Sequence, residues 1–487
     1  MKKILIAAII ILCLVTVGLF PMDLFVMSVP EWVIYVLLGV IAVLAAAICI
    51  VHKKKAPKIT AVILTVITAA AAVSGIYIDP YFNSITLRSA PGTLPYDTVI
   101  PADKAIEDLK YVIHYFMKDH PVKKVGGEDA SVLKIADYVE SKIEQAGSVT
   151  VNELCAYIEN ALSQLGDAHT SAYTKFTEPL FLRHYAKWQT GSWKIAAING
   201  ISIKELLEQK KDLYSFEAES WELEQLKAEL VKLQGLDYLG FSVQDGVTYT
   251  YENDEGEVQE ETYYPEDFVT YEKYYELNPE SHNENEEPFV SFTVDEEKSL
   301  AMLTLRECIY NDEYIKTVRD MFTQVKDKGI QNVAVDLRGN GGGDDRTAVE
   351  FIRYLDTDGY KYASETMLLG FFMTARSNDY IVNERYSDLT FSGSLYILTS
   401  SGSFSSAMLF PQYIKDNGLG TLIGEPPGND PNGYGEIATF RTPNAGIFFC
   451  ISTKRFYRAD QNCTDKYVMP DVQCDADSAP DVLYDMI

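Results

Sequence analysis

Three long apolar runs at the start of the chain predict a membrane anchor over residues 1–79. They cover about residues 4–20, 32–52 and 59–78. The last two runs are long enough to cross a bilayer as helices, whereas the first is marginal. Lys2 and Lys3 precede the first run and four lysines lie between the second and third, so the positive-inside rule places everything after Ile78 outside the cytoplasm. A cleaved signal peptide is the alternative interpretation of residues 1–20.

Residues 80–183 are predicted to form a helical subdomain. Apolar residues recur at helical spacing in two stretches, residues 106–118 and 131–146. A capping box at residues 150–153 begins a third helix, which Gly166 ends. Asp167 and His169 are therefore expected on the loop that follows this helix.

The next segment, residues 184–287, has a mixed pattern that predicts a small separate module. Residues 193–198 favour a strand, Asn199-Gly200 a tight turn and residues 203–210 a short helix. Residues 252–287 hold fourteen acidic residues and a single lysine. We interpret them as a solvated linker or insertion, and an acidic docking surface is the alternative.

Residues 288–487 show strands that alternate with helices. Strands are predicted at 289–294, 300–305, 333–335, 395–398, 421–423, 437–440 and 447–451, and helices at 311–328, 347–355 and 405–416. Such alternation is typical of a layered α/β core.

The charge of the chain excludes some partners. Its 487 residues include 42 Lys and Arg against 70 Asp and Glu, a formal charge of −28. Six of the lysines and three of the acidic residues lie in residues 1–79, so the outer part carries −31. An excess of this size repels nucleic acid and anionic lipid headgroups, and neither is expected as a ligand.

The seven cysteines do not form a recognisable framework. Five lie beyond residue 79, and no C-x-x-C pair occurs among them. One disulfide among Cys450, Cys463 and Cys474 stays open by spacing. Because paired ligand spacing is absent, no structural zinc or other metal is expected.

A glycine-rich loop, D-L-R-G-N-G-G-G-D at residues 336–344, follows a predicted buried strand and precedes a helix. Its glycines free the backbone to adopt positive φ and to present N–H groups to an anion. Such a loop binds phosphate or forms an oxyanion hole. No Gly-Lys-Ser/Thr ends it, so it is not a P-loop, and a tight structural turn is the alternative.

A second motif, S-G-S-F-S-S-A-M at residues 401–408, turns a strand through small residues into a helix. This geometry is similar to a nucleophile elbow, in which a serine at the helix start faces outward and the helix N-terminus favours negative charge. Ser405 is the best-placed nucleophile. Ser403 and Ser406 stay open as alternatives, and a serine-rich turn that only caps the helix is the structural interpretation.

Together with L-G-D-A-H-T at residues 165–170, these motifs resemble the serine peptidases that include C-terminal processing (tail-specific) proteases and tricorn. The resemblance covers about residues 106–472. It implies an α/β fold, with a Clp-protease/crotonase-like catalytic core, a preceding helical domain and a degenerate PDZ-like module to which residues 193–210 would belong. It also implies a polypeptide substrate and no cofactor.

The resemblance assigns roles to individual residues. Ser405 matches the family nucleophile, and the N–H groups of Ser406 and of Gly341 or Gly342 match the oxyanion hole. The tail-specific branch takes its base from a lysine about 25 positions after the serine, where this chain has Asp430. A lysine base is therefore not expected at that position.

The tricorn-like branch takes its base from a histidine, and His169 occupies the corresponding place in D-A-H-T. An imidazole with a pKa near neutrality suits this role. Asp465 precedes a Pro-Asp pair as the tricorn glutamate does, and is expected to orient His169. Glu436 and Asp460 are the alternatives.

These features predict a multi-pass cell-membrane protein with an outer serine endopeptidase domain. The alternative is an inactive homologue that binds peptides, since Met408 stands where the family usually has Glu, Ala168 replaces a serine and Pro411 interrupts the predicted helix. An enzyme should lose activity with Ser405→Ala and with His169→Ala while it remains folded.

Overall fold

The structure is a computed structural model. It describes residues 2–25, 31–87, 89–127, 129–183, 193–253, 255–278, 288–377 and 380–487.

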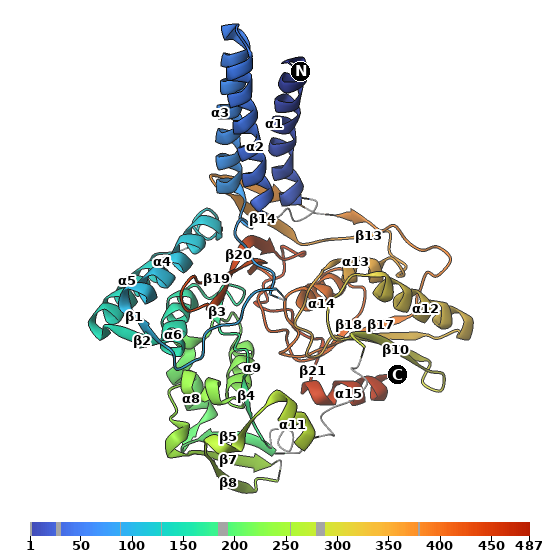
Figure 1. Cartoon of the computed structure of the whole chain (residues 1–487). Coiled ribbons are helices and arrows are strands. Elements are labelled where there is room, and N and C mark those ends of the chain that lie inside the picture. The colour runs from blue at the N-terminus through green and yellow to red at the C-terminus, as the bar shows by residue number, and fades with distance from the viewer. Residues whose placement is uncertain are drawn as a thin grey trace.

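Three helices at the N-terminus pack side by side and project from one end of the molecule (Figure 1). They are α1 (Lys2–Phe25), α2 (Glu31–Val51) and α3 (Lys55–Ile78). All three are long and apolar enough to cross a membrane, including the first, which the sequence left marginal. Large apolar side chains are exposed on their outer faces, which is the pattern of helices that face lipid.

The helical subdomain consists of three helices: α4 (Ala102–Asp119), α5 (Ala130–Ala146) and α6 (Val151–Leu162). The predicted capping box is confirmed, because the Thr150 side chain accepts from the Glu153 N–H and the Glu153 carboxylate accepts from the Thr150 N–H. A short 3-10 turn, Ser163–Leu165, extends α6, and Gly166 ends it at φ 65°. The chain thus turns into the His169 loop.

The small module lies at the end of the molecule opposite to α1–α3 (Figure 1). A four-stranded sheet has the order β6-β5-β7-β8. Its strands are β5 (Trp193–Ile198), β6 (Ile201–Ser202), β7 (Val247–Asn253) and β8 (Val258–Tyr263), and its helices are α8 (Ile203–Lys210), α9 (Glu219–Glu229) and α10 (Leu233–Tyr238). The predicted strand, turn and helix at 193–210 are confirmed, with Asn199 and Gly200 at positive φ. The PDZ-like identity of this module stays a prediction.

The linker interpretation of residues 252–287 is wrong for much of the segment. Strand β8, strand β9 (Phe268–Thr270) and helix α11 (Tyr271–Leu277) are folded within it. The segment folds because Tyr263 and Phe268 are buried in the core of the module, while Glu266 between them is exposed. Residues 279–287 of this segment lie outside the described residues.

The α/β core is built on a six-stranded sheet of order β10-β11-β12-β17-β18-β21. Only β10 is antiparallel to its neighbour. The strands are β10 (Val290–Asp295), β11 (Leu300–Leu305), β12 (Asn332–Asp336), β17 (Ser394–Thr399), β18 (Thr421–Gly424) and β21 (Val472–Gln473).

Helices cover both faces of this sheet. Helices α12 (Asp312–Lys328), α13 (Arg346–Ile352) and α14 (Ser406–Asp416) bury one face, and α15 (Ala479–Met486) buries the other. Helix α14 is continuous through Pro411, so the expected interruption there is wrong. Because the strands are parallel, the glycine loop after β12 and the serine turn after β17 leave the same edge of the sheet.

A second, antiparallel sheet faces the core. Its order is β15-β14-β20-β19, and β3 (Ser171–Tyr173) pairs with β20. The strands are β14 (Ser364–Leu369), β15 (Phe372–Arg376), β19 (Tyr434–Arg441) and β20 (Phe448–Tyr457). Helices α4–α6 pack on β19 and β20 through one apolar cluster. All seven cysteines are free thiols, so the disulfide considered from spacing is not formed.

Candidate active site

The turn from β17 to α14 holds Ser405 in an unusual backbone conformation, with φ 56° and ψ −121°. Such a conformation costs a non-glycine residue about 1–3 kcal/mol and persists only where the surroundings impose it. The Asn429 side chain imposes it here, because its Oδ1 accepts the Ser405 N–H at 2.9 Å. Asn429 is itself buried.

The neighbouring serines, Ser403 and Ser406, bond the serine turn to the glycine loop and the end of β12. Ser403 is buried, and its hydroxyl donates to the Leu337 carbonyl at 2.8 Å. The Ser406 hydroxyl donates to the Gly343 carbonyl at 2.8 Å. Ser405 is half-buried, and its Oγ makes no hydrogen bond to another described residue. Of the three, Ser405 therefore has the hydroxyl that is available for chemistry.

The glycine loop packs directly against this turn. Gly342 has φ 101°, and a Cβ placed on it would lie 2.7 Å from the Ser405 Cβ. Asn340 ties the two loops together, because its carbonyl accepts the Phe404 N–H and its side chain accepts the Gly342 N–H. Only glycine at position 342 lets the two loops approach this closely.

The expected oxyanion donors are not equivalent. The Gly342 N–H is already bound to Asn340 Oδ1 at 2.8 Å. The N–H groups of Gly341 and Ser406 donate to no other described residue, and both residues line the cavity beside Ser405. Of the two glycines left open by the sequence, the geometry favours Gly341. The N-terminal position of Ser406 in α14 adds the positive end of the helix dipole.

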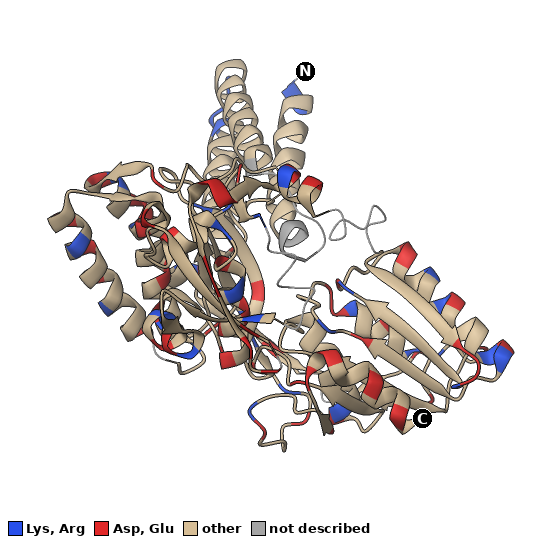
Figure 2. Cartoon of the chain, turned by 90° about the horizontal axis from the view of Figure 1, so that it is seen from below, with Lys and Arg blue, Asp and Glu red and all other residues tan. Residues whose placement is uncertain are grey.

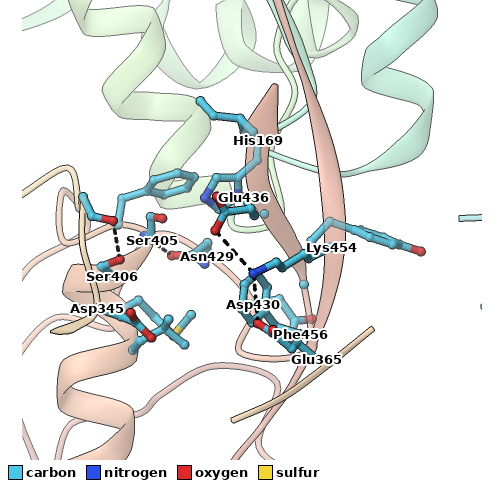
Figure 3. Close-up of a pocket in the computed structure, with 18 of the residues that line it drawn as sticks. His169, Asp345, Glu365, Ser405, Ser406, Asn429, Asp430, Glu436, Lys454 and Phe456 are labelled. Carbon is cyan, nitrogen blue, oxygen red and sulfur yellow. Dashed lines mark hydrogen bonds and ion pairs between the residues drawn. The ribbon is translucent and has the colours of Figure 1, made fainter. Parts of the chain in front are cut away.

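His169 lies in the same cavity as Ser405 (Figure 3). Its ring packs at a tilt of 33° against Phe404, with the ring centres 4.5 Å apart, and Phe404 stacks on Trp221 of α9 at 4.1 Å. Neither ring nitrogen of His169 has a hydrogen-bond partner among the described residues. The imidazole is thus near the nucleophile without being bonded to it.

Asp167 positions the His169 loop. Its carboxylate accepts the His169 backbone N–H at 2.9 Å and the His120 Nε2–H at 3.1 Å. The Val122 N–H donates to His120 Nδ1, which leaves the proton of a neutral His120 on Nε2. Burial raises the pKa of Asp167, but the His120 bond and the two histidines outweigh it and hold that pKa below its usual value.

Burial lowers the pKa of His169, and the charge of Asp167 opposes this shift only in part. The imidazole is therefore neutral at neutral pH, the state that a general base requires.

The structure does not bring Asp465 to His169. Asp465 is exposed, and its backbone carbonyl accepts from Arg458, whose guanidinium is buried against Asp416 at 2.8 Å. Arg458 thus holds the segment that contains Asp465 against Asp416, away from the imidazole of His169. Of the alternatives, Asp460 pairs with Lys361 at 3.2 Å.

Glu436 lines the cavity but is paired with Lys454 at 3.6 Å. Lys454 also contacts Glu365 at 3.3 Å, so its ammonium lies between two carboxylates (Figure 3). Its presence in the cavity was not expected, because it stands on β20, far from the position at which the tail-specific branch has its lysine.

Glu217 is the carboxyl group that sequence reasoning missed. It lies just before α9, in an acidic stretch without a motif, and no local signal distinguishes it. Burial, followed by the charge of Asp167, raises its pKa well above the usual range. One of its oxygens accepts the Asp430 N–H at 2.6 Å, and the other has no partner among the described residues.

Ligand atoms of Asp167, His169 and Glu217 lie within 4.8 Å of one another. A divalent cation could be held by such a set of ligand types. The hydrogen bonds that each carboxylate already accepts, and the raised pKa of Glu217, also suit a proton shared within the cluster.

The cavity at Ser405 has a volume of about 600 Å³ and lies between the loops that follow β12 and β17 and the antiparallel sheet. Ser405, His169 and Gly341 lie on one side. Strands β14, β15, β19 and β20 supply the opposite wall. A space of this size accommodates several side chains of an extended polypeptide.

Residues 299–474 match the model of peptidase family S41. The α/β core is therefore similar to the serine peptidase domains of family S41. No curated protein sequence matches the chain.

Solved structures share the fold of this chain. Mature CPAF complexed with lactacystin has a TM-score of 0.55 at 12% identity, and the match covers 79% of this chain and 96% of that one. A CPAF mutant has a TM-score of 0.58 at 10% identity, with 79% and 95% covered. The photosystem II D1 C-terminal processing protease gives 0.43 at 13% identity, with 76% and 93% covered. The expected α/β core with a preceding helical region is confirmed.

Proposed function

We propose that this protein is a membrane-anchored serine endopeptidase that hydrolyses polypeptides outside the cytoplasm through an acyl-enzyme. One observation carries the proposal. Ser405 sits at positive φ at the start of α14, and its hydroxyl faces a cavity of about 600 Å³. This hydroxyl and the N–H groups of Gly341 and Ser406 beside it have no partner in the described part of the chain. A serine turn that only capped the helix would not require the strained conformation.

In the proposed reaction, Ser405 Oγ attacks the scissile carbonyl and a bond forms between Oγ and the carbonyl carbon. The carbonyl oxygen becomes an oxyanion, which the N–H groups of Gly341 and Ser406 stabilise. Collapse of this intermediate releases the amine and leaves an acyl-enzyme. Water then hydrolyses the ester and restores the Ser405 hydroxyl.

His169 is the proposed base. It accepts the Ser405 proton as Oγ attacks, and donates it to the leaving amine. Because its ring packs against Phe404 and not against Ser405, the proposal requires a rotation of the imidazole toward Ser405 Oγ when substrate binds. Trp221 of the small module stacks on Phe404, so a movement of that module would free the imidazole.

One carboxyl group is proposed to orient the imidazole, and there are two candidates for it. Asp465 stays the proposal that rests on family resemblance, and it would require rearrangement of its segment around Arg458. Glu217 is the alternative that is already next to His169. Asp167 accepts a hydrogen bond from the backbone of the loop and acts on the ring through its charge, at 4.0 Å from His169 Nδ1.

The three apolar helices and the distribution of lysines support an outer location for the catalytic core. In this arrangement the substrates are polypeptides at the outer face of the membrane. The net negative charge of the outer part supports the expectation that nucleic acid is not a partner.

The test is hydrolysis of quenched-fluorescence peptides by the full chain in detergent. Ser405→Ala and His169→Ala should each lower kcat/KM by about 10³-fold or more, whereas Ser401→Ala in the same turn should retain activity. Peptides that bind equally to the wild type and to both variants, without cleavage by any of them, would instead identify a peptide-binding pseudopeptidase.

A further inference from the structure

The hairpin of β14 and β15 ends in an exposed aromatic tip. Phe371 is 73% exposed and Phe372 67% exposed, and the adjacent Met373 is 38% exposed. The turn between the strands is formed by Gly370 at φ 60° and Phe371. Two adjacent phenylalanines that both face solvent are unusual on the surface of a soluble domain and mark an interaction site.

This tip meets the last residues of the apolar helix α3. The rings of Phe371 and Tyr77 lie 4.8 Å apart. A Cβ placed on Gly370 would lie 3.0 Å from the Tyr77 ring and 3.3 Å from the Ile78 Cα. Figure 1 shows β14 beneath the foot of the three-helix bundle. The tip is therefore level with the end of the candidate membrane span Lys55–Ile78.

We propose that Phe371 and Phe372 insert into the interfacial layer of the same lipid bilayer that α3 crosses. The inference rests on the proposed membrane anchoring. Aromatic side chains are favoured at this depth, and Tyr77, 45% exposed at the helix end, extends the same aromatic surface. The occupant is lipid because the tip is continuous with a helix that exposes large apolar side chains from Ile59 to Val73.

The hairpin connects this membrane contact to the catalytic cavity. Glu365 of β14 and Arg376 of β15 are register partners at the root of the hairpin, and both line the cavity. Phe371 lies six positions after Glu365, which is at most about 20 Å of extended strand. The cavity is thereby held close to the bilayer, and its substrates are polypeptide segments within about 20 Å of the membrane surface, such as the juxtamembrane segments of other membrane proteins.

Photo-crosslinking tests the membrane contact directly. The full chain is reconstituted in nanodiscs of phosphatidylcholine with p-benzoylphenylalanine in place of Phe371. Irradiation should add the mass of a phospholipid. The matched control replaces Tyr264, which is 45% exposed at the opposite end of the molecule and should give no lipid adduct.

The same photo-crosslinking residue in place of Ile67 of α3 distinguishes failure of the hairpin inference from failure of the membrane anchor. Lipid adducts at Ile67 without any at Phe371 would overturn the hairpin inference and leave the membrane anchor standing. The same holds for a crosslink from Phe371 that adds the mass of a second protein, which would identify a partner chain instead. Absence of adducts at both positions would overturn the membrane anchor itself, and the hairpin inference with it.

A second measurement tests whether the hairpin tip favours cleavage of substrates near the membrane. Phe371→Ser with Phe372→Ser should lower cleavage of a peptide tethered to the nanodisc lipid and leave cleavage of the same free peptide unchanged. An equal loss on both peptides would show that the tip supports the fold of the cavity. An unchanged rate on both would contradict a role in placing the cavity near the membrane.

Discussion

At the scale of single residues, the site depends on a few side chains that hold strained backbone in place. Ser405 keeps its positive φ because Asn429 accepts its N–H. Gly342 permits the glycine loop to touch the serine turn. These contacts fix where the Gly341 and Ser406 N–H groups point, so small changes in them should alter reactivity at Ser405 more than they alter stability.

Asn429→Ala should lower the reactivity of Ser405 while the protein remains folded. It leaves the Ser405 N–H without its acceptor, which costs about 1–3 kcal/mol in a buried site. The expected result is at least about a tenfold fall in the rate of fluorophosphonate labelling, since 1.4 kcal/mol corresponds to a factor of ten. Labelling at the wild-type rate would show that the turn needs no such support.

Gly342→Ala should abolish activity. Its Cβ would meet the Ser405 Cβ at 2.7 Å and the Phe404 carbonyl at 2.7 Å. Gly339→Ala is the matched control, because Gly339 also has positive φ but has open space where a Cβ would lie. Equal loss of activity in both variants would attribute the effect to backbone strain rather than to the contact with Ser405.

The pH dependence of kcat/KM should report His169. Burial lowers its pKa from the ordinary value of 6.5, and only the neutral imidazole can accept the Ser405 proton. Activity should therefore persist as the pH falls to 6.5 and decline only below it. Asp167→Asn removes a charge that raises this pKa, so it should move the decline to still lower pH. A midpoint above 6.5 would contradict the assignment of His169 as base.

At the scale of elements, periodicity predicted most of the fold. The helices at 203–210 and 405–416, and the strands that carry the glycine loop and the serine turn, follow local patterns of apolar residues and caps. Strand β15 was missed because all of its residues are exposed, so no apolar alternation marks it. The acidic segment was misread because buried tyrosines, rather than its carboxylates, decide its fold.

The candidate site was predictable only where a motif carries it. Ser405, His169 and the glycine loop stand in short motifs, and the structure places them around one cavity. Lys454 lines the same cavity and Glu217 lies beside His169, and both come from distant elements through tertiary packing, which leaves no local trace in the sequence. The position of Asp465 depends on the buried Arg458–Asp416 ion pair, a long-range contact that spacing cannot show.

Thr150→Ala should test how helix α6 supports the His169 loop. Loss of the capping box is expected to lower the free energy of unfolding by about 1 kcal/mol. Thr150→Ser keeps the capping hydroxyl and should be close to wild type in thermal unfolding. A loss of activity without loss of stability would show that the cap, unexpectedly, acts on the site itself.

At the scale of the whole molecule, charge and apolar surface are segregated. The three helices carry few charges along their length, while acidic residues are spread over the remaining elements (Figure 2). This arrangement suits a protein whose anchor lies in lipid and whose catalytic part is surrounded by water. The aromatic hairpin tip lies where these two parts meet.

The proposed topology predicts which lysines are accessible from outside intact cells. An impermeant amine reagent should label lysines of the outer part, such as Lys316, which is 76% exposed, and spare the lysines between α2 and α3. Peptide mass mapping of the labelled chain gives the answer. The reverse pattern would place the catalytic core in the cytoplasm.

The central claim is that Ser405 is an activated nucleophile, and the most direct test is its reaction with a fluorophosphonate probe read by intact mass. The full chain should gain one adduct, which Ser405→Ala and His169→Ala lose and Ser401→Ala retains. Absence of an adduct on the folded wild-type chain in a membrane, or an adduct that survives Ser405→Ala, would contradict the account.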